Sequence, residues 1–152
     1  MSPLRDAFAE VVYRAALALD RGDHPGFLAL CADDFRYSIG AHSPEIRRPM
    51  VWLDHDKAGL QGLFETLSRH NSDRSPLSRH VTVYTVDVTG DEARMVSALQ
   101  VFRTRLDGGA TELFAVGKIF DSARLVAGTV LLTKRQIQLD TRQLGIGSHV
   151  PF

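Results

Sequence analysis

The sequence predicts a single α+β domain in which N-terminal helices pack against a strongly curved antiparallel sheet to form a cone. In the first half of the chain, apolar residues recur mainly at helical spacing. The second half instead holds four strand-like runs, and the short turn-forming breaks between them are typical of hairpins. With 152 residues, the chain has the length of one domain that can bury a real core.

Three helices are predicted before the sheet is complete. Ser2-Pro3 supplies an N-cap hydroxyl and a proline at the first helical position, and an apolar stripe then continues to the helix end at Gly22. Asp23 begins a second, shorter helix. Asp54-His55-Asp56 opens the third helix, whose apolar residues again fit helical spacing.

Six strands are predicted, two between the helices and four after them. Residues 35–39 alternate between apolar and polar, and Pro49 confines the run 47–53 to an edge or a bulge of the sheet. Asp121-Ser122 is taken as the last break because both residues favour turns. The four later runs are residues 80–88, 93–106, 112–120 and 125–139.

The chain divides into one domain and a tail. Residues 1–139 are predicted to form the domain, and residues 140–152 form a glycine-rich tail with apolar ends. We expect this tail to dock at a subunit interface, because its glycines allow sharp bends and its apolar residues need cover.

Composition and charge argue against several classes of protein. Eighteen Lys and Arg balance eighteen Asp and Glu, and neither half is a basic arm, which argues against nucleic-acid binding. Cys31 is the single cysteine, so this chain alone holds no disulfide framework, zinc ribbon or iron–sulfur cluster. With no membrane-spanning apolar run and no signal-peptide core, we expect a cytoplasmic protein.

Six short segments carry a resemblance to a known family: Tyr13-Arg14 through Leu19-Asp20, Phe27-Leu28-Ala29-Leu30, Asp33-Asp34-Phe35-Arg36-Tyr37, Asp56-Lys57, Ser78-Arg79-His80-Val81 and Val101-Phe102-Arg103-Thr104-Arg105. Their order and spacing resemble the small, or beta, subunit of Rieske-type ring-hydroxylating oxygenases. The cone-shaped fold of that family is shared with nuclear transport factor 2, scytalone dehydratase and polyketide cyclases. The resemblance therefore implies an NTF2-like, or SnoaL-like, cone.

The resemblance also implies a function. It implies a non-catalytic beta subunit of a dioxygenase or monooxygenase of aromatic hydrocarbon catabolism, forming a homotrimer within an α3β3 complex that supports the large alpha subunits. The Rieske [2Fe–2S] cluster and the mononuclear iron then lie in the large subunit, and this chain binds no cofactor or metal. A Rieske centre needs two Cys and two His, and one cysteine agrees with this division.

Three segments depart from the family pattern and leave the substrate class open between aromatic and non-aromatic compounds. His55 replaces the usual aspartate before the Asp-Lys pair, and residues 47–52 and 139–149 also differ.

The residues keep an alternative open, a stand-alone SnoaL-like dehydratase or isomerase with an acid-base pocket inside the cone. His80 and Tyr84 share one face of a strand, while Val81 and Val83 on the other face are more typical of core. The candidate pocket residues of this alternative are Tyr37, Asp54, His80 and Tyr84. A third interpretation is a binding or assembly module without chemistry.

The subunit interpretation instead needs contact residues. Basic residues of the later strands and residues of the tail are the candidates, because an inward-facing arginine needs either a partner or an interface. These interface candidates are Arg103, Arg105, Arg135, Arg142, His149 and Phe152. Cys31 is predicted to be a buried thiol without a catalytic role.

Overall fold

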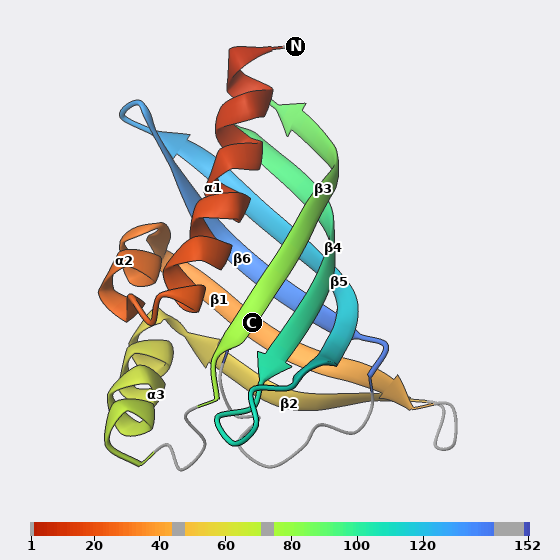
Figure 1. The fold of residues 1–152 in the computed structure, drawn as a ribbon. Coiled ribbons are helices and arrows are strands. Elements are labelled where there is room, and N and C mark those ends of the chain that lie inside the picture. The colour runs from red at the N-terminus through yellow and green to blue at the C-terminus, as the bar shows by residue number, and fades with distance from the viewer. Residues whose placement is uncertain (1, 44–47, 71–74, 142–150) are drawn as a thin grey trace.

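A computed structural model describes residues 2–43, 48–70, 75–141 and 151–152 of the chain (Figure 1). The order of its elements confirms the predicted one, with helices and two strands preceding a four-stranded meander. The elements are α1 (Pro3–Asp20), α2 (His24–Ala29), β1 (Cys31–Ser43), β2 (Arg48–Asp56), α3 (Lys57–His70), β3 (Leu77–Thr89), β4 (Glu92–Thr104), β5 (Thr111–Val126) and β6 (Thr129–Leu139).

The described strands form a six-stranded sheet in the order β2-β1-β6-β5-β4-β3. Strands β3 to β6 form the predicted antiparallel meander, and β2 is an edge strand, as Pro49 indicated. The prediction of a wholly antiparallel sheet is wrong for one pair, because β1 and β6 run parallel. These two strands are distant in sequence, so no hairpin turn forces them to run in opposite directions.

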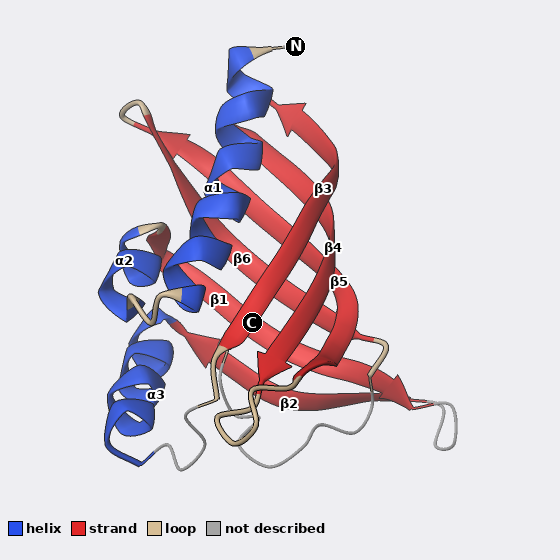
Figure 2. Cartoon of the chain, in the orientation of Figure 1, coloured by secondary structure: helices blue, strands red, loops and turns tan. Residues whose placement is uncertain are grey.

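The helices lie on one side of the curved sheet (Figure 2). Helix α1 contacts β3, β4 and β6, while α2 and α3 pack near β1 and α3 also contacts β2. The predicted apolar stripe of α1 is buried, with Phe8 and Val12 fully enclosed, and it joins Phe35 and Leu99 of the sheet in one core. The helices and the sheet therefore share one core on the inner side of the cone.

Two aspartates fix where the shorter helices begin. The Asp23 carboxylate accepts a hydrogen bond from the Gly26 backbone N–H at 3.0 Å, and Asp56 accepts one from the Gly59 N–H at 2.7 Å. The prediction that Asp54-His55-Asp56 opens the third helix therefore holds for Asp56 alone. All three residues lie in β2, where Asp54 pairs with Ser38 and His55 with Tyr37 of β1, and Asp56 at the end of the strand also caps α3.

The prediction of a turn at Asp121-Ser122 is wrong. Strand β5 continues to Val126, and the turn to β6 lies at Ala127 and Gly128, whose φ angles of 49° and 82° are both positive. Asp121 stays in the strand because Arg135 lies directly opposite it on β6 and neutralises its charge. A turn-forming residue is thus held in a strand by its cross-strand partner.

The candidate site in the cone interior and on the outer face of the sheet

Side chains alternate between two faces of the sheet. We call the face that packs against the helices the inner face and the opposite one the outer face. On β5, for example, Ile119 and Asp121 are buried on the inner face, whereas Phe120 between them is 37% exposed on the outer face. Each candidate residue can therefore be assigned to the interior of the cone or to its surface.

A buried ion pair occupies the inner face. The Arg135 guanidinium donates to both carboxylate oxygens of Asp121, with Nε to Oδ1 at 2.8 Å and Nη2 to Oδ2 at 3.0 Å. Their side chains are only 2% and 0% exposed. Burial alone lowers the pKa of Arg135, but the Asp121 carboxylate outweighs burial and raises this pKa above its usual value. The two side chains therefore satisfy each other's hydrogen-bonding groups inside the cone.

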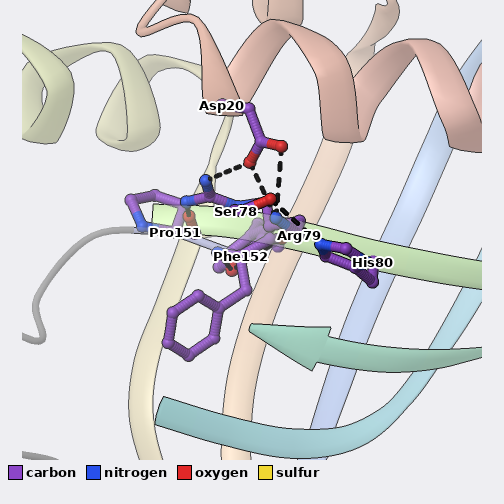
Figure 3. A network of polar contacts seen from close by, with 7 residues as sticks. Asp20, Ser78, Arg79, His80, Pro151 and Phe152 are labelled. Atoms are coloured by element: carbon purple, nitrogen blue, oxygen red, sulfur yellow. Dashed lines mark hydrogen bonds and ion pairs between the residues drawn. The ribbon is translucent and has the colours of Figure 1, made fainter. Parts of the chain in front are cut away.

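A second interior cluster joins α1, β3 and residues 151–152 (Figure 3). The Asp20 carboxylate accepts hydrogen bonds from the Arg79 backbone N–H and, at 2.9 Å, from its guanidinium Nη1. The Arg79 Nη2 donates to the Pro151 carbonyl oxygen at 2.7 Å. The Phe152 backbone N–H donates to the Tyr37 hydroxyl at 2.8 Å. This cluster closes the interior with the chain's own polar groups.

Neither the buried phenol nor the buried thiol is poised for proton transfer near neutral pH. Burial raises the pKa of Tyr37 to about 12 and, likewise, that of Cys31 to about 12. The Cys31 thiol is buried, as predicted, and donates to the Phe27 carbonyl oxygen at 3.4 Å between Sγ and O. Both side chains thus contribute to packing and hydrogen bonding rather than to acid-base chemistry.

The four residues of the predicted acid-base pocket do not converge in the structure. Tyr37 is fully buried in the interior. Asp54 lies on the outer face, where its carboxylate accepts from Arg36 at 3.0 Å, and both side chains are more than half exposed. His80 and Tyr84 are exposed residues of β3. Strand alternation therefore separates Tyr37 from Asp54 by the thickness of the sheet.

His80 also has its own local partners outside the cone. Its ring Nε2 lies 3.1 Å from the Ser78 hydroxyl, and its ring packs edge-on against Phe102 with centroids 4.9 Å apart. Val81 and Val83, on the opposite face of the strand, pack against the core, as their alternation predicted.

Two of the predicted interface residues face inward. Arg135 has the partner that an inward arginine needs, but Asp121 of its own chain supplies it rather than another subunit. Phe152 is 1% exposed because its ring packs edge-on against Phe114, with centroids 6.3 Å apart. The structure therefore places both side chains inside the cone rather than on its surface.

Of the other interface candidates, two form ion pairs within the chain and two lie outside the described residues. Arg103 donates to Glu112 from Nε at 3.0 Å and lies over the Phe114 ring, with its guanidinium carbon 4.9 Å from the ring centroid. Arg105 is half exposed and lies 3.4 Å from the same carboxylate. Arg142 and His149 lie outside the described residues.

The outer face carries apolar side chains that the chain itself leaves exposed. Tyr84 is 60% exposed and Leu113 is 55% exposed, and Phe120 lies beside Val96 across the β4–β5 pair. Towards the β2 edge, an open groove of about 480 Å³ is lined by residues of β1, β2 and β6 from both faces of the sheet, the buried Tyr37 and Arg135 among them: Arg36, Tyr37, Ser38, Val51, Asp54, Thr133, Lys134 and Arg135. This face thus offers apolar contacts beside exposed charges.

The described part of the chain lacks the features of a metal site and of a membrane span. No group of three or more His, Cys, Asp or Glu side chains there is arranged to hold a metal ion. None of the helices in this part is long and apolar enough to cross a membrane. The absence of a cofactor from this chain stays a prediction.

The comparisons with known proteins agree on one family. A SnoaL-like domain model matches residues 2–136. The chain is 44% identical over 156 aligned residues to the methanesulfonate monooxygenase hydroxylase subunit beta of Methylosulfonomonas methylovora, covering 97% of this chain and 86% of that protein. It is 33% identical over 149 residues to the 2-aminobenzenesulfonate 2,3-dioxygenase subunit beta of an Alcaligenes species, covering 96% and 97%.

Solved structures show the same fold. One, described as the beta subunit of an aromatic-ring-hydroxylating dioxygenase of Novosphingobium aromaticivorans, matches with a TM-score of 0.83 and 24% identity, covering 97% of this chain and 96% of that one. A ketosteroid isomerase-like protein of Erwinia carotovora matches with a TM-score of 0.65 and 16% identity, covering 93% and 99%. At these identities, the structural matches support the fold alone.

Proposed function

Because the chain belongs to the SnoaL-like family and, within it, to the beta subunits of oxygenase hydroxylases, we propose that it is the non-catalytic beta subunit of a multicomponent oxygenase. The observation that carries this function is the 44% identity to a hydroxylase beta subunit, which extends over 97% of the chain. The partner is the large, or alpha, subunit of the same hydroxylase.

The interior of the cone supports a role without chemistry of its own. Arg135 and Asp121 neutralise each other, and Tyr37 and Arg79 hold backbone groups of residues 151–152. A general acid or base must instead keep a titratable proton available near neutral pH. In the described interior, these polar groups are engaged in holding the fold together.

The redox chemistry belongs to the alpha subunit in this proposal. A Rieske [2Fe–2S] cluster needs two Cys and two His, whereas this chain contains Cys31 as its single cysteine. The alpha subunit therefore carries the cluster and the mononuclear iron, and the beta subunit fixes the distances between alpha subunits.

We also propose a homotrimer within an α3β3 complex. Its support is the outer face of the broad curved sheet, where apolar residues such as Tyr84, Leu113 and Phe120 are exposed. A formal net charge of zero adds support, because it removes long-range repulsion between copies.

The names of the two relatives indicate a class of substrate for the proposed hydroxylase. One is named for methanesulfonate and the other for 2-aminobenzenesulfonate, one aliphatic and one aromatic compound that share a sulfonate group. The proposed hydroxylase therefore oxidises an organic sulfonate, which is bound in the alpha subunit. Oxygen uptake by the reconstituted system should respond to a sulfonate and not to the matching carboxylate, such as acetate in place of methanesulfonate.

Co-expression with the large oxygenase subunit of the same hydroxylase tests the proposed function. We expect the two chains to purify together in equal numbers, native mass spectrometry to give three of each, and iron to be lost when the large subunit is omitted. Purification of this chain as a lone protein that turns over a substrate without iron would contradict the proposal.

A further inference from the structure

Interior side chains form hydrogen bonds with the backbone of residues 151–152. Both of these residues are buried. The chain recognises their backbone at two points, since Arg79 donates to the Pro151 carbonyl at 2.7 Å and the Tyr37 hydroxyl accepts from the Phe152 N–H at 2.8 Å. The Tyr37 hydroxyl also lies 3.5 Å from the Phe152 carbonyl oxygen.

The side chains of the segment are recognised as well. The Phe152 ring packs edge-on against Phe114 at an interplanar angle of 78°, the geometry that aromatic pairs prefer. Proline has a fixed φ and no N–H to satisfy, so Pro151 presents its carbonyl to Arg79 from a restricted backbone. The pocket therefore matches a Pro-Phe sequence through both its backbone and its ring.

Part of the pocket is held in place by contacts that do not involve residues 151–152. Arg79 is held by the Asp20 carboxylate through its backbone N–H and its Nη1, and Tyr37 is fixed within β1. The Arg79 side chain is 2% exposed, yet its Nε has no hydrogen-bond partner among the described atoms. Leaving a buried donor without a partner is costly, and this guanidinium retains one donor beyond its contacts with Asp20 and Pro151.

We propose that Tyr37, Arg79 and Phe114 form a peptide-binding site for a short Pro-Phe segment, which residues 151–152 fill in this chain and which also binds the same segment when another molecule supplies it. The ligand is a short apolar peptide. Its proline carbonyl accepts a hydrogen bond from Arg79, its phenylalanine N–H donates to Tyr37, and its phenyl ring packs against Phe114. This inference goes beyond the proposed function and does not depend on the alpha subunit.

Emptying the site and adding the segment back as a separate molecule tests this inference. The double variant Pro151→Gly, Phe152→Gly keeps the full chain but removes the ring and the restricted backbone. The probe is the peptide acetyl-His-Val-Pro-Phe-amide, and the matched control is acetyl-His-Val-Pro-Ala-amide. Binding is measured by isothermal titration calorimetry, after near-UV circular dichroism has established native packing.

We expect the Phe peptide to bind the double variant at least tenfold more tightly than the Ala peptide. It should also bind the unchanged chain at least tenfold more weakly, because residues 151–152 already occupy the site. Adding Tyr37→Phe to the double variant should weaken binding severalfold, because the acceptor for the amide N–H is lost. A natively packed double variant that binds neither peptide, or binds both equally, overturns the proposal.

A second measurement covers the case in which the double variant does not fold. Incorporating 4-fluorophenylalanine at position 152 of the otherwise unchanged chain gives a single ¹⁹F resonance. Excess Phe peptide should move this resonance from its buried position to that of a solvent-exposed ring, and the Ala peptide should not. A resonance that stays in place at millimolar Phe peptide contradicts the proposal.

Discussion

Ion pairs on the two faces of the sheet differ in their exposure to solvent. On the inner face, Asp121 and Arg135 form a pair that is almost entirely buried. On the outer face, the pair of Arg36 and Asp54 has the same chemistry, but both side chains are more than half exposed. This difference in exposure indicates that the interior charges maintain the fold, whereas the charged and apolar groups on the outer face are available to partners.

Breaking the inner pair should have the largest effect. We expect Asp121→Ala to lower the free energy of unfolding by about 3–5 kcal/mol, because it leaves the Arg135 charge buried without a partner. Urea denaturation followed by circular dichroism measures this loss. The matched control is Asp54→Ala on the outer face, which should cost about 0–1 kcal/mol. Equal losses in the two variants would remove the contrast between the faces.

Removing the ring of Phe152 comes next. We expect Phe152→Ala to lower the free energy of unfolding by about 3 kcal/mol, because a buried aromatic side chain is lost and a cavity is left against Phe114. Phe120→Ala is the control, since that ring is already 37% exposed on the outer face and should cost less than half as much. Comparable costs for the two rings would show that Phe152 is not packed as described.

Alkaline pH should lower the free energy of unfolding, because the Tyr37 hydroxyl is buried. The pKa of Tyr37 is about 12 in the folded chain and about 10 when unfolded, so the unfolded state releases the proton first as pH rises. Stability from this group is therefore complete below about pH 10 and is lost as pH approaches 12, by about 2–3 kcal/mol. Cys31 adds a similar loss that begins near pH 9.

The variant Tyr37→Phe isolates the phenol in that titration. Its unfolding free energy should fall less steeply than that of the unchanged chain between pH 10 and pH 12, while both chains share the earlier fall due to Cys31. Parallel stability curves for the two chains over this range would count against a buried Tyr37 hydroxyl.

The outer face should show the smallest effect on stability and the clearest effect on assembly. We expect Tyr84→Ala to change the free energy of unfolding by about 0.5 kcal/mol or less, because the side chain is 60% exposed. Native mass spectrometry of the co-expressed complex should nevertheless show weaker association between subunits. Unchanged association after combined Tyr84→Ala and Phe120→Ser substitution would direct the search for the interface to another surface.

Local patterns predicted most of the fold. The apolar stripe of α1, the edge position of β2 and the meander from β3 to β6 all follow from spacing and turn chemistry within short stretches of sequence. The carboxylates of Asp23 and Asp56 likewise cap helices through contacts only three residues away. Such features depend on neighbours along the chain, and the sequence displays those neighbours directly.

Features that depend on distant partners do not follow from local patterns. Asp121 suggests a turn when its own segment is considered. Its spacing from Ile119 and Ala123, which are both buried, is the signal that could have indicated a strand residue on the inner face. Arg79 carries the same kind of signal, because it is in phase with Val81 and Val83 on the inner face of β3, but the sequence does not show which partners its charge meets. Its role depends on Asp20 and Pro151, which come from the two ends of the chain.

The α+β class, the order of elements and the family follow from the amino-acid sequence, because periodicity, caps and short motifs are local properties. The parallel pairing of β1 with β6, the contact of Arg135 with Asp121 and the hydrogen bond between Tyr37 and Phe152 instead depend on how the elements pack. Each of these joins residues on different elements. Whether a charge faces a partner or the solvent is fixed only when the curved sheet has packed against the helices.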